Sequence, residues 1–128
     1  MRSRLLIVDD EPTILLTLRA LLEHHGMVVV SARSATEAKL RLQTAVFDLV
    51  ITDMRMETET AGHDVICCAN EQNYRPATAI LTAYPLLAAR DIPHNAKSLL
   101  VKPMNTAELL ATIEALLSAR GRRRSAGT

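Results

Sequence analysis

Residues 47–53 of this chain read FDLVITD, and they have the features of a buried strand that ends on a carboxylate. The run of Leu49, Val50 and Ile51 has the length and the β-branched content that a strand of a parallel sheet needs. Asp53 follows where the chain leaves the sheet. In open α/β sheets, ligands bind at this carboxyl end of the strands. The segment therefore predicts a functional carboxylate at Asp53.

Two further segments have the same design. Residues 5–8 (LLIV) run into Asp9 and Asp10, and residues 98–101 (SLLV) run into Lys102. Because the carboxyl ends of parallel strands share one edge of a sheet, we expect these charged side chains to meet the carboxylate of the central segment there.

Strand and helix patterns alternate five times along the chain, which predicts an α/β fold, a parallel sheet with helices on both faces. The expected strands are residues 4–8, 27–30, 47–52, 77–81 and 98–101. Helices are expected at about residues 12–25, 34–44, 63–72 and 105–120, with Gly26 and Gly121 ending the first and the last. A helix near residues 86–90 is expected to be short or irregular, because Pro93 interrupts the pattern.

The length of 128 residues indicates a single domain, expected over residues 1–120, with a basic tail or linker stub at 121–128. Four of the 15 basic residues are arginines between 120 and 124. The other 11 stand against 14 acidic residues, so the body carries a net charge of −3. A nucleic-acid-binding surface is therefore not indicated.

The cysteine pattern and the hydropathy indicate a cytoplasmic location. Cys67 and Cys68 are adjacent and match neither a metal motif nor a disulfide framework, which suits a reducing compartment. We expect them to be small apolar residues of a helix. No apolar run approaches the roughly 18 residues of a membrane helix, so no membrane partner is expected.

The predicted cluster of Asp9, Asp10 and Asp53 is suited to a divalent cation. Like charges this close need a counter-ion or a shared proton, and carboxylate oxygens are ligands that Mg²⁺ prefers. Lys102 would supply a cation opposite, and Thr82, at the end of the fourth strand, a hydroxyl. Such a set is suited to phosphoryl transfer to an aspartate, in which the carboxylate attacks while metal and lysine balance the phosphoryl charge.

The motifs IVDDEP (7–12), DMRM (53–56), LTA (81–83) and VKP (101–103) occur in this order along the chain. Together they resemble the receiver domain of two-component response regulators, over about residues 3–120. The resemblance implies a flavodoxin-like three-layer fold in which five parallel strands, ordered 2-1-3-4-5, are covered by five helices.

The resemblance also implies the metal ligands and the acceptor. Asp53 would be the phosphoacceptor and a ligand of Mg²⁺. Asp10 would bind Mg²⁺ directly, Asp9 would bind it through water, and the backbone carbonyl of Arg55 would be a further ligand.

The remaining implied roles concern signalling. Lys102 would contact the phosphoryl group, and Thr82 would move towards it. The phosphoryl group would come from a sensor histidine kinase or a phosphotransfer protein. The domain would catalyse only its own phosphorylation and dephosphorylation, and it would switch its contacts with a second copy or with a downstream output protein.

Three departures from the family pattern qualify this interpretation. Glu57 stands where the family usually has proline, and the loop from Asp53 to Gly62 is about one residue longer than usual, which predicts a looser loop beside the metal site. Leu99 stands where the family has its switch aromatic, which predicts weak coupling between phosphorylation and pairing with a partner.

Alternative functions follow from the same residues. A Mg²⁺-dependent phosphohydrolase would also form an aspartyl-phosphate, but its nucleophile belongs to an Asp-x-Asp motif after the first strand. A receiver-like interaction module would have lost the acceptor or the lysine, and both are present. A flavodoxin-type cofactor domain would need a phosphate-binding loop rich in Gly, Ser or Thr after the first strand.

Overall fold

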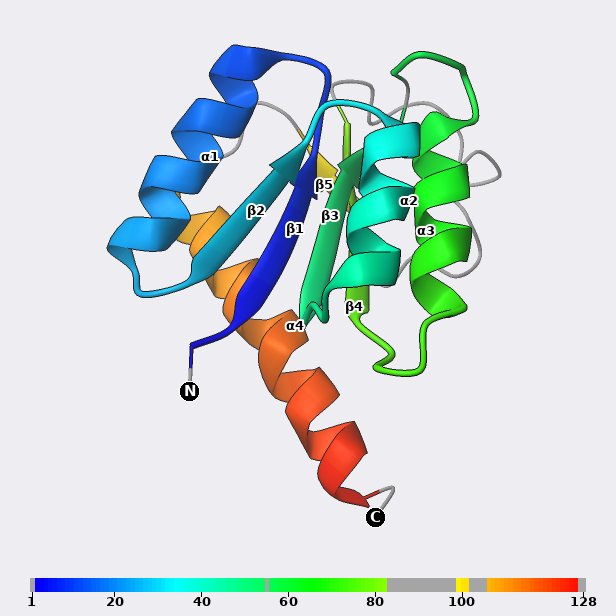
Figure 1. Ribbon diagram of the computed structural model, residues 1–128. Helices are drawn as coiled ribbons and strands as arrows, with labels where there is room; N and C mark the ends of the chain where they lie inside the picture. Colours follow the sequence, from blue (N-terminus) through cyan, green and yellow to red (C-terminus); the bar gives the residue numbers. More distant parts are fainter. Residues whose placement is uncertain (1, 55, 83–98, 102–105, 127–128) are drawn as a thin grey trace.

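Parallel strands form the centre of the fold (Figure 1). The structure is a computed structural model that describes residues 2–54, 56–82, 99–101 and 106–126. Its five-stranded sheet has the order β2-β1-β3-β4-β5, which is the order predicted. The strands are β1 (Arg4–Val8), β2 (Val28–Ala32), β3 (Leu49–Asp53), β4 (Ala77–Thr82) and β5 (Leu99–Val101). The described helices are α1 (Pro12–His24), α2 (Ala35–Thr44), α3 (Ala61–Asn70) and α4 (Thr106–Ala126).

Helices cover both faces of the sheet, so the molecule has three layers (Figure 1). Alternation along β1 separates the two cores, because successive side chains of a strand point to opposite faces. Leu5 and Ile7 pack with residues of α1 and α4, whereas Leu6 and Val8 pack with residues of α2 and α3. The strands therefore read as continuous apolar runs, as buried parallel strands do.

Local signals at the helix ends agree with the structure. Pro12 is the first residue of α1, where its missing N–H costs no hydrogen bond. Gly26 follows that helix with a φ of +85°, a conformation that glycine adopts without strain. Ser34 caps α2 by accepting a hydrogen bond from the Glu37 N–H at 3.1 Å.

The end of the last helix differs from the prediction. The sequence pattern ends it at Gly121, but α4 continues to Ala126. A single glycine costs a helix only about 1 kcal/mol relative to alanine, so it does not stop a helix that good helix formers such as arginine continue. In Figure 1, the far end of α4 projects past the edge of the sheet at which the strands begin.

Other element boundaries shift by one or two residues. The second strand ends at Ala32 rather than residue 30, because it stays paired with β1 up to the contact of Val8 with Ala32. The third helix begins at Ala61 rather than residue 63. The expected short helix at residues 86–90 lies outside the described residues.

Cys68 has the expected apolar role, whereas Cys67 is less buried. Cys68 is a residue of α3 that is buried in the core, and burial raises the pKa of its thiol. Cys67 is half-buried with its Sγ 3.4 Å from the His63 Nε2, and neither cysteine forms a disulfide. None of the helices described by the structure is both long and apolar enough to cross a membrane.

Candidate functional site

The pairing of β1 with β3 brings the predicted acidic residues together. Val8 pairs with Thr52, so Asp9, which follows β1, and Asp53, which ends β3, lie at the same level of adjacent strands. Asp10 is the next residue along the chain. One carboxylate oxygen from each of Asp9, Asp10 and Asp53 lies within 4.8 Å of the others, and this is the acidic group found among the described residues.

The three carboxylates are arranged from the interior outwards. Asp9 is fully buried, Asp53 is half-buried and Asp10 is exposed. The Asp9 Oδ1 accepts a hydrogen bond from the Glu11 N–H at 3.0 Å, and the Asp9 N–H donates to the Ala32 carbonyl at 3.1 Å. The site therefore has a rigid inner carboxylate and an outer one that is open to water.

Asp53 is held by its own backbone surroundings. Its Oδ1 accepts a hydrogen bond from the Met54 N–H at 2.8 Å, and its carbonyl accepts one from the Thr52 hydroxyl at 2.9 Å. Because the Met54 N–H fixes one carboxylate oxygen, it orients the whole carboxylate group at the end of β3.

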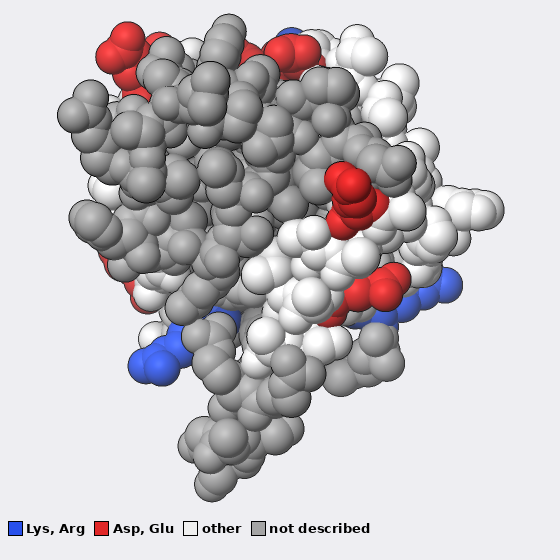
Figure 2. All heavy atoms as spheres, turned by 180° about the vertical axis from the view of Figure 1, so that it is seen from behind, with Lys and Arg blue, Asp and Glu red and all other residues white. Residues whose placement is uncertain are grey.

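The electrostatics of the cluster favour a bound cation. Two unit charges 4 Å apart repel by about 1 kcal/mol in water and by about 4 kcal/mol at a partly buried site. A divalent cation with oxygen ligands would convert this repulsion into attraction, so the donor set fits a hard ion such as Mg²⁺. Figure 2 shows acidic side chains at the upper edge of the molecule, where the strands end in Figure 1.

The structure describes only one of the other predicted site residues, and only its backbone. Thr82 ends β4, whose residue Leu81 pairs with Asp53, so the backbone of Thr82 lies near the carboxylate cluster. Lys102 follows the last residue of β5 but lies outside the described residues, as does Arg55. The side chain of Leu99 is likewise outside what the structure describes.

Glu57 has a structural role that the sequence did not predict. Its carboxylate accepts hydrogen bonds from the Ala35 N–H at 3.0 Å to each oxygen and from the Thr36 N–H at 3.4 Å. Burial alone would raise the pKa of Glu57, but these hydrogen bonds and the charge of Lys39 lower it. The loop between β3 and α3 is therefore fastened to the start of α2, which corrects the expectation of a looser loop.

Gly62 allows the same loop to close tightly. Its N–H donates to the Met54 carbonyl at 2.9 Å. A Cβ built on Gly62 would overlap with the carbonyl oxygen of Asp53 and would stand 2.7 Å from the Met54 Cα. The base of the loop thus requires glycine at this position.

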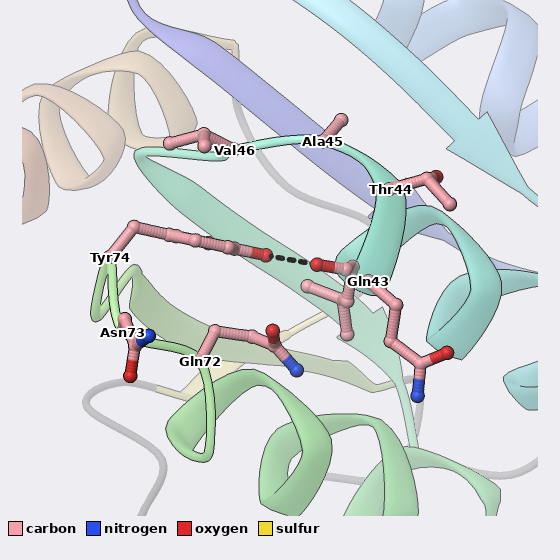
Figure 3. A pocket seen from close by; sticks show the side chains of 8 residues that line it. Gln43, Thr44, Ala45, Val46, Gln72, Asn73 and Tyr74 are labelled. Atoms are coloured by element: carbon pink, nitrogen blue, oxygen red, sulfur yellow. Dashed lines mark hydrogen bonds between the residues drawn. The ribbon is translucent and has the colours of Figure 1, made fainter.

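A surface pocket of about 300 Å³ lies at the opposite edge of the sheet, before the starts of β3 and β4. Its walls come from the end of α2 and from the turn after α3 (Figure 3). The Tyr74 side chain extends from one wall to the other, and its hydroxyl donates a hydrogen bond to the Leu42 carbonyl at 2.9 Å. This pocket is remote from the carboxylate cluster and is separate from the predicted site.

Comparisons with known proteins match the chain to the family that its sequence motifs resemble. Residues 5–114 match the family model of the response regulator receiver domain. The chain is 40% identical over 118 residues to the alginate biosynthesis transcriptional regulatory protein AlgB of Pseudomonas putida, covering 90% of this chain and 26% of AlgB. It is 34% identical over 116 residues to the response regulator protein PilR of Pseudomonas aeruginosa, covering 87% of this chain and 26% of PilR. The chain thus spans about a quarter of the length of these relatives.

Solved structures resemble the whole fold. The response regulator protein TrrA of Thermotoga maritima, in complex with Mg²⁺ and BeF, superimposes with a TM-score of 0.76 at 29% identity. This match covers 91% of the present chain and 99% of TrrA.

Proposed function

Because this chain belongs to the family of response regulator receiver domains, we propose that it accepts a phosphoryl group on Asp53 and passes on the signal by changing its contacts with partners. The observation that carries the proposal is the meeting of Asp9, Asp10 and Asp53 at the carboxyl ends of β1 and β3. Asp53 is the acceptor in this proposal because it ends the central strand and projects from a half-buried position.

The chemistry assigned to Asp53 is nucleophilic attack on phosphorus. One carboxylate oxygen forms the new P–O bond while the bond from phosphorus to the donor breaks, and the donor departs with its electron pair. The hydrogen bond from the Met54 N–H to Oδ1 orients the carboxylate for this attack. An oriented nucleophile avoids part of the entropic cost of the reaction.

The proposed metal ligands are Asp10, Asp53 and the backbone carbonyl of Arg55, with Asp9 acting through water. Bound Mg²⁺ would neutralise the carboxylates and the phosphoryl oxygens. The buried Asp9 would hold the inner side of the site, while the exposed Asp10 lies where an ion arriving from water reaches it first.

Two further residues complete the proposed reaction. Lys102 would bind a phosphoryl oxygen through its ammonium group, and Thr82 would donate its hydroxyl to the same group. Thr82 ends β4, which neighbours β3, and Lys102 follows β5, which neighbours β4, so the proposal puts both side chains at the edge of the sheet where Asp53 lies.

The proposed partners follow from the family and from the charge on the acceptor. A sensor histidine kinase or a phosphotransfer protein would supply the phosphoryl group, in the cytoplasm. The domain would catalyse only its own phosphorylation and dephosphorylation. Phosphorylation adds charge and acceptor oxygens to Asp53, which would shift the contacts of the domain with a second copy or an output protein.

A phosphohydrolase is the less favoured function. Its nucleophile would belong to an Asp-x-Asp motif after the first strand, whereas the chain has Asp9, Asp10 and Glu11 in succession there. The chain also matches the receiver family over residues 5–114. Turnover of a small phosphate ester by the protein would support this alternative.

Phosphorylation of Asp53 can be tested by intact mass. The protein is incubated with acetyl phosphate and Mg²⁺, and we expect it to gain one phosphoryl group. The Asp53→Asn variant should gain none at that position, while Asp64→Asn, which changes a carboxylate on α3, should label like the parent. Full labelling of Asp53→Asn would show that Asp53 is not the acceptor.

A further inference from the structure

We propose that Glu57 is a positioning residue of the metal site, which fixes the loop after Asp53 relative to the loop that supports Asp9. The inference rests on the proposed function, since it assigns to Glu57 an effect on the affinity for Mg²⁺. The observation is the bond between the Glu57 carboxylate and the first N–H groups of α2.

The contact has a clear physical basis. The first N–H groups of a helix have no partner within the helix, and the positive end of the helix dipole favours a carboxylate. Ser34 accepts the Glu37 N–H, and Glu57 accepts the N–H groups of Ala35 and Thr36. The β3–α3 loop therefore supplies the carboxylate of a shared cap, and its bond to α2 is charge-assisted.

The bond joins the two sides of the acidic cluster. On one side, Glu57 follows Asp53 in the same loop. On the other, Ala35 follows β2 closely, and the last residue of β2, Ala32, accepts the Asp9 N–H at 3.1 Å. A path of backbone and hydrogen bonds thus runs from Asp53 through Glu57 and α2 to Asp9.

The other end of the loop is fixed independently. The Gly62 N–H donates to the Met54 carbonyl, and the Met54 N–H donates to the Asp53 Oδ1. With its base fixed at Gly62 and its middle fixed at Glu57, the loop has little freedom to rotate the Asp53 carboxylate away from Asp9. Metal sites depend on such supporting contacts, since residues that orient ligands contribute strongly to metal affinity.

A simpler role for Glu57 is that it only stabilises α2. This role predicts a loss of folding stability without an effect on the metal. The two roles differ in the affinity for Mg²⁺ and in the response of the α2 amides to Mg²⁺, so both quantities are measured.

The test compares Mg²⁺ titrations of the unphosphorylated parent, Glu57→Ala, Glu57→Gln and the matched control Glu59→Ala. Glu59 is an exposed acid of the same loop, so its variant loses the same charge. Calorimetry gives the dissociation constants, NMR follows the amide signals of Ala35 and Thr36, and urea unfolding gives the stability of each variant.

We expect the dissociation constant for Mg²⁺ to rise by about threefold to tenfold in Glu57→Ala, at or below the low end of the effect of substituting a residue that orients a metal ligand. Glu57→Gln should lie between this variant and the parent, because its amide oxygen can still accept a hydrogen bond. Glu59→Ala should change the constant by less than about twofold, since salt screens an exposed charge. In the parent, the Ala35 and Thr36 amide signals should shift with the same midpoint as the calorimetric titration.

Equal dissociation constants in Glu57→Ala and Glu59→Ala would overturn the inference and leave Glu57 as a helix cap only. Phosphorylation of Asp53 would then still stand, because its mass assay does not involve Glu57. If Glu57→Ala does not fold, the comparison of Glu57→Gln with Glu59→Ala decides in the same way. Failure of the parent itself to bind Mg²⁺ would overturn the proposed metal site and this inference together.

Discussion

Gly62 lies against the backbone of Asp53 so closely that a Cβ on Gly62 would overlap with the Asp53 carbonyl oxygen. The contact joins the first turn of α3 to the end of β3, where the proposed phosphoacceptor lies. Both partners are backbone, so neither can yield by a change of side-chain rotamer. The shape of the site is therefore sensitive to a single methyl group at this position.

The Gly62→Ala variant should lose about 3 kcal/mol of unfolding free energy, at the upper end of the usual cost of overpacking. It should also accept less phosphoryl group on Asp53, because the loop must move away from β3. Urea unfolding and intact mass after treatment with acetyl phosphate measure the two effects.

Gly26→Ala provides the control for this substitution. Gly26 has a φ of +85°, and apart from Gly26 itself and its chain neighbours no atom lies within 4 Å of the place that a methyl group would take there, so alanine meets backbone strain but no clash with the rest of the fold. It should cost about 1–2 kcal/mol and leave phosphorylation unchanged. Equal phosphorylation of Gly62→Ala and Gly26→Ala would contradict the importance of the contact with Asp53.

Asp10 is expected to supply much of the affinity for Mg²⁺ in the unphosphorylated protein. It is the exposed member of the cluster, and its carboxylate oxygen lies within 4.8 Å of those of Asp9 and Asp53. Asp10→Ala should raise the dissociation constant by about tenfold or more. Calorimetric titration measures this, with Glu11→Gln as a neighbouring control, and an unchanged constant in Asp10→Ala would remove Asp10 from the site.

Tyr74 should make the stability depend on pH in alkaline solution. Burial, together with the nearby Cys68, raises the pKa of Tyr74 to about 12. In the unfolded chain a tyrosine has a pKa of about 10. The folded state therefore keeps the proton when the unfolded state loses it, so this contribution is complete below about pH 10 and is lost as the pH rises towards 12.

Comparison with Tyr74→Phe isolates this contribution. At neutral pH the variant should be less stable by about 1 kcal/mol, because it loses the hydrogen bond to the Leu42 carbonyl. Between about pH 10 and 12 the difference between parent and variant should shrink. Urea unfolding at a series of pH values measures it, and a constant difference across that range would show that the hydroxyl is not protected in the folded state.

The sequence predicted those features that depend on local pattern and on strand direction. Apolar runs located β1 and β3, and the rule that ligands bind where parallel strands end brought Asp9 and Asp53 to one edge. The role of Glu57 could not be predicted, since its bond to Ala35 spans 22 residues and joins a loop to the start of a helix. An acidic residue in a polar loop has many available partners, and only the folded chain selects one.

The last helix shows a different limit of sequence patterns. Glycine after an apolar stripe is the usual signal for the end of a helix, because it adopts the left-handed conformation at low cost. Gly121 nevertheless lies within α4, which runs to Ala126. The signal is permissive: glycine allows a helix to end, but the residues on both sides decide whether it does.

Gly121→Ala tests whether α4 continues through Gly121 or ends there. Inside a helix, alanine is favoured over glycine by about 1 kcal/mol, so the substitution should increase the helix content and slow amide exchange in the last turns of α4. If the helix instead ended at Gly121 in a left-handed conformation, alanine would be strained there and the same turns would exchange faster. Circular dichroism and hydrogen exchange on the parent and the variant measure the sign of the change. Ser118→Ala, in the same helix, serves as the control for an ordinary increase in helix propensity. A gain of helix content in both variants would show that α4 passes through Gly121 in solution. A gain in Ser118→Ala with a loss in Gly121→Ala would show that the helix ends at Gly121.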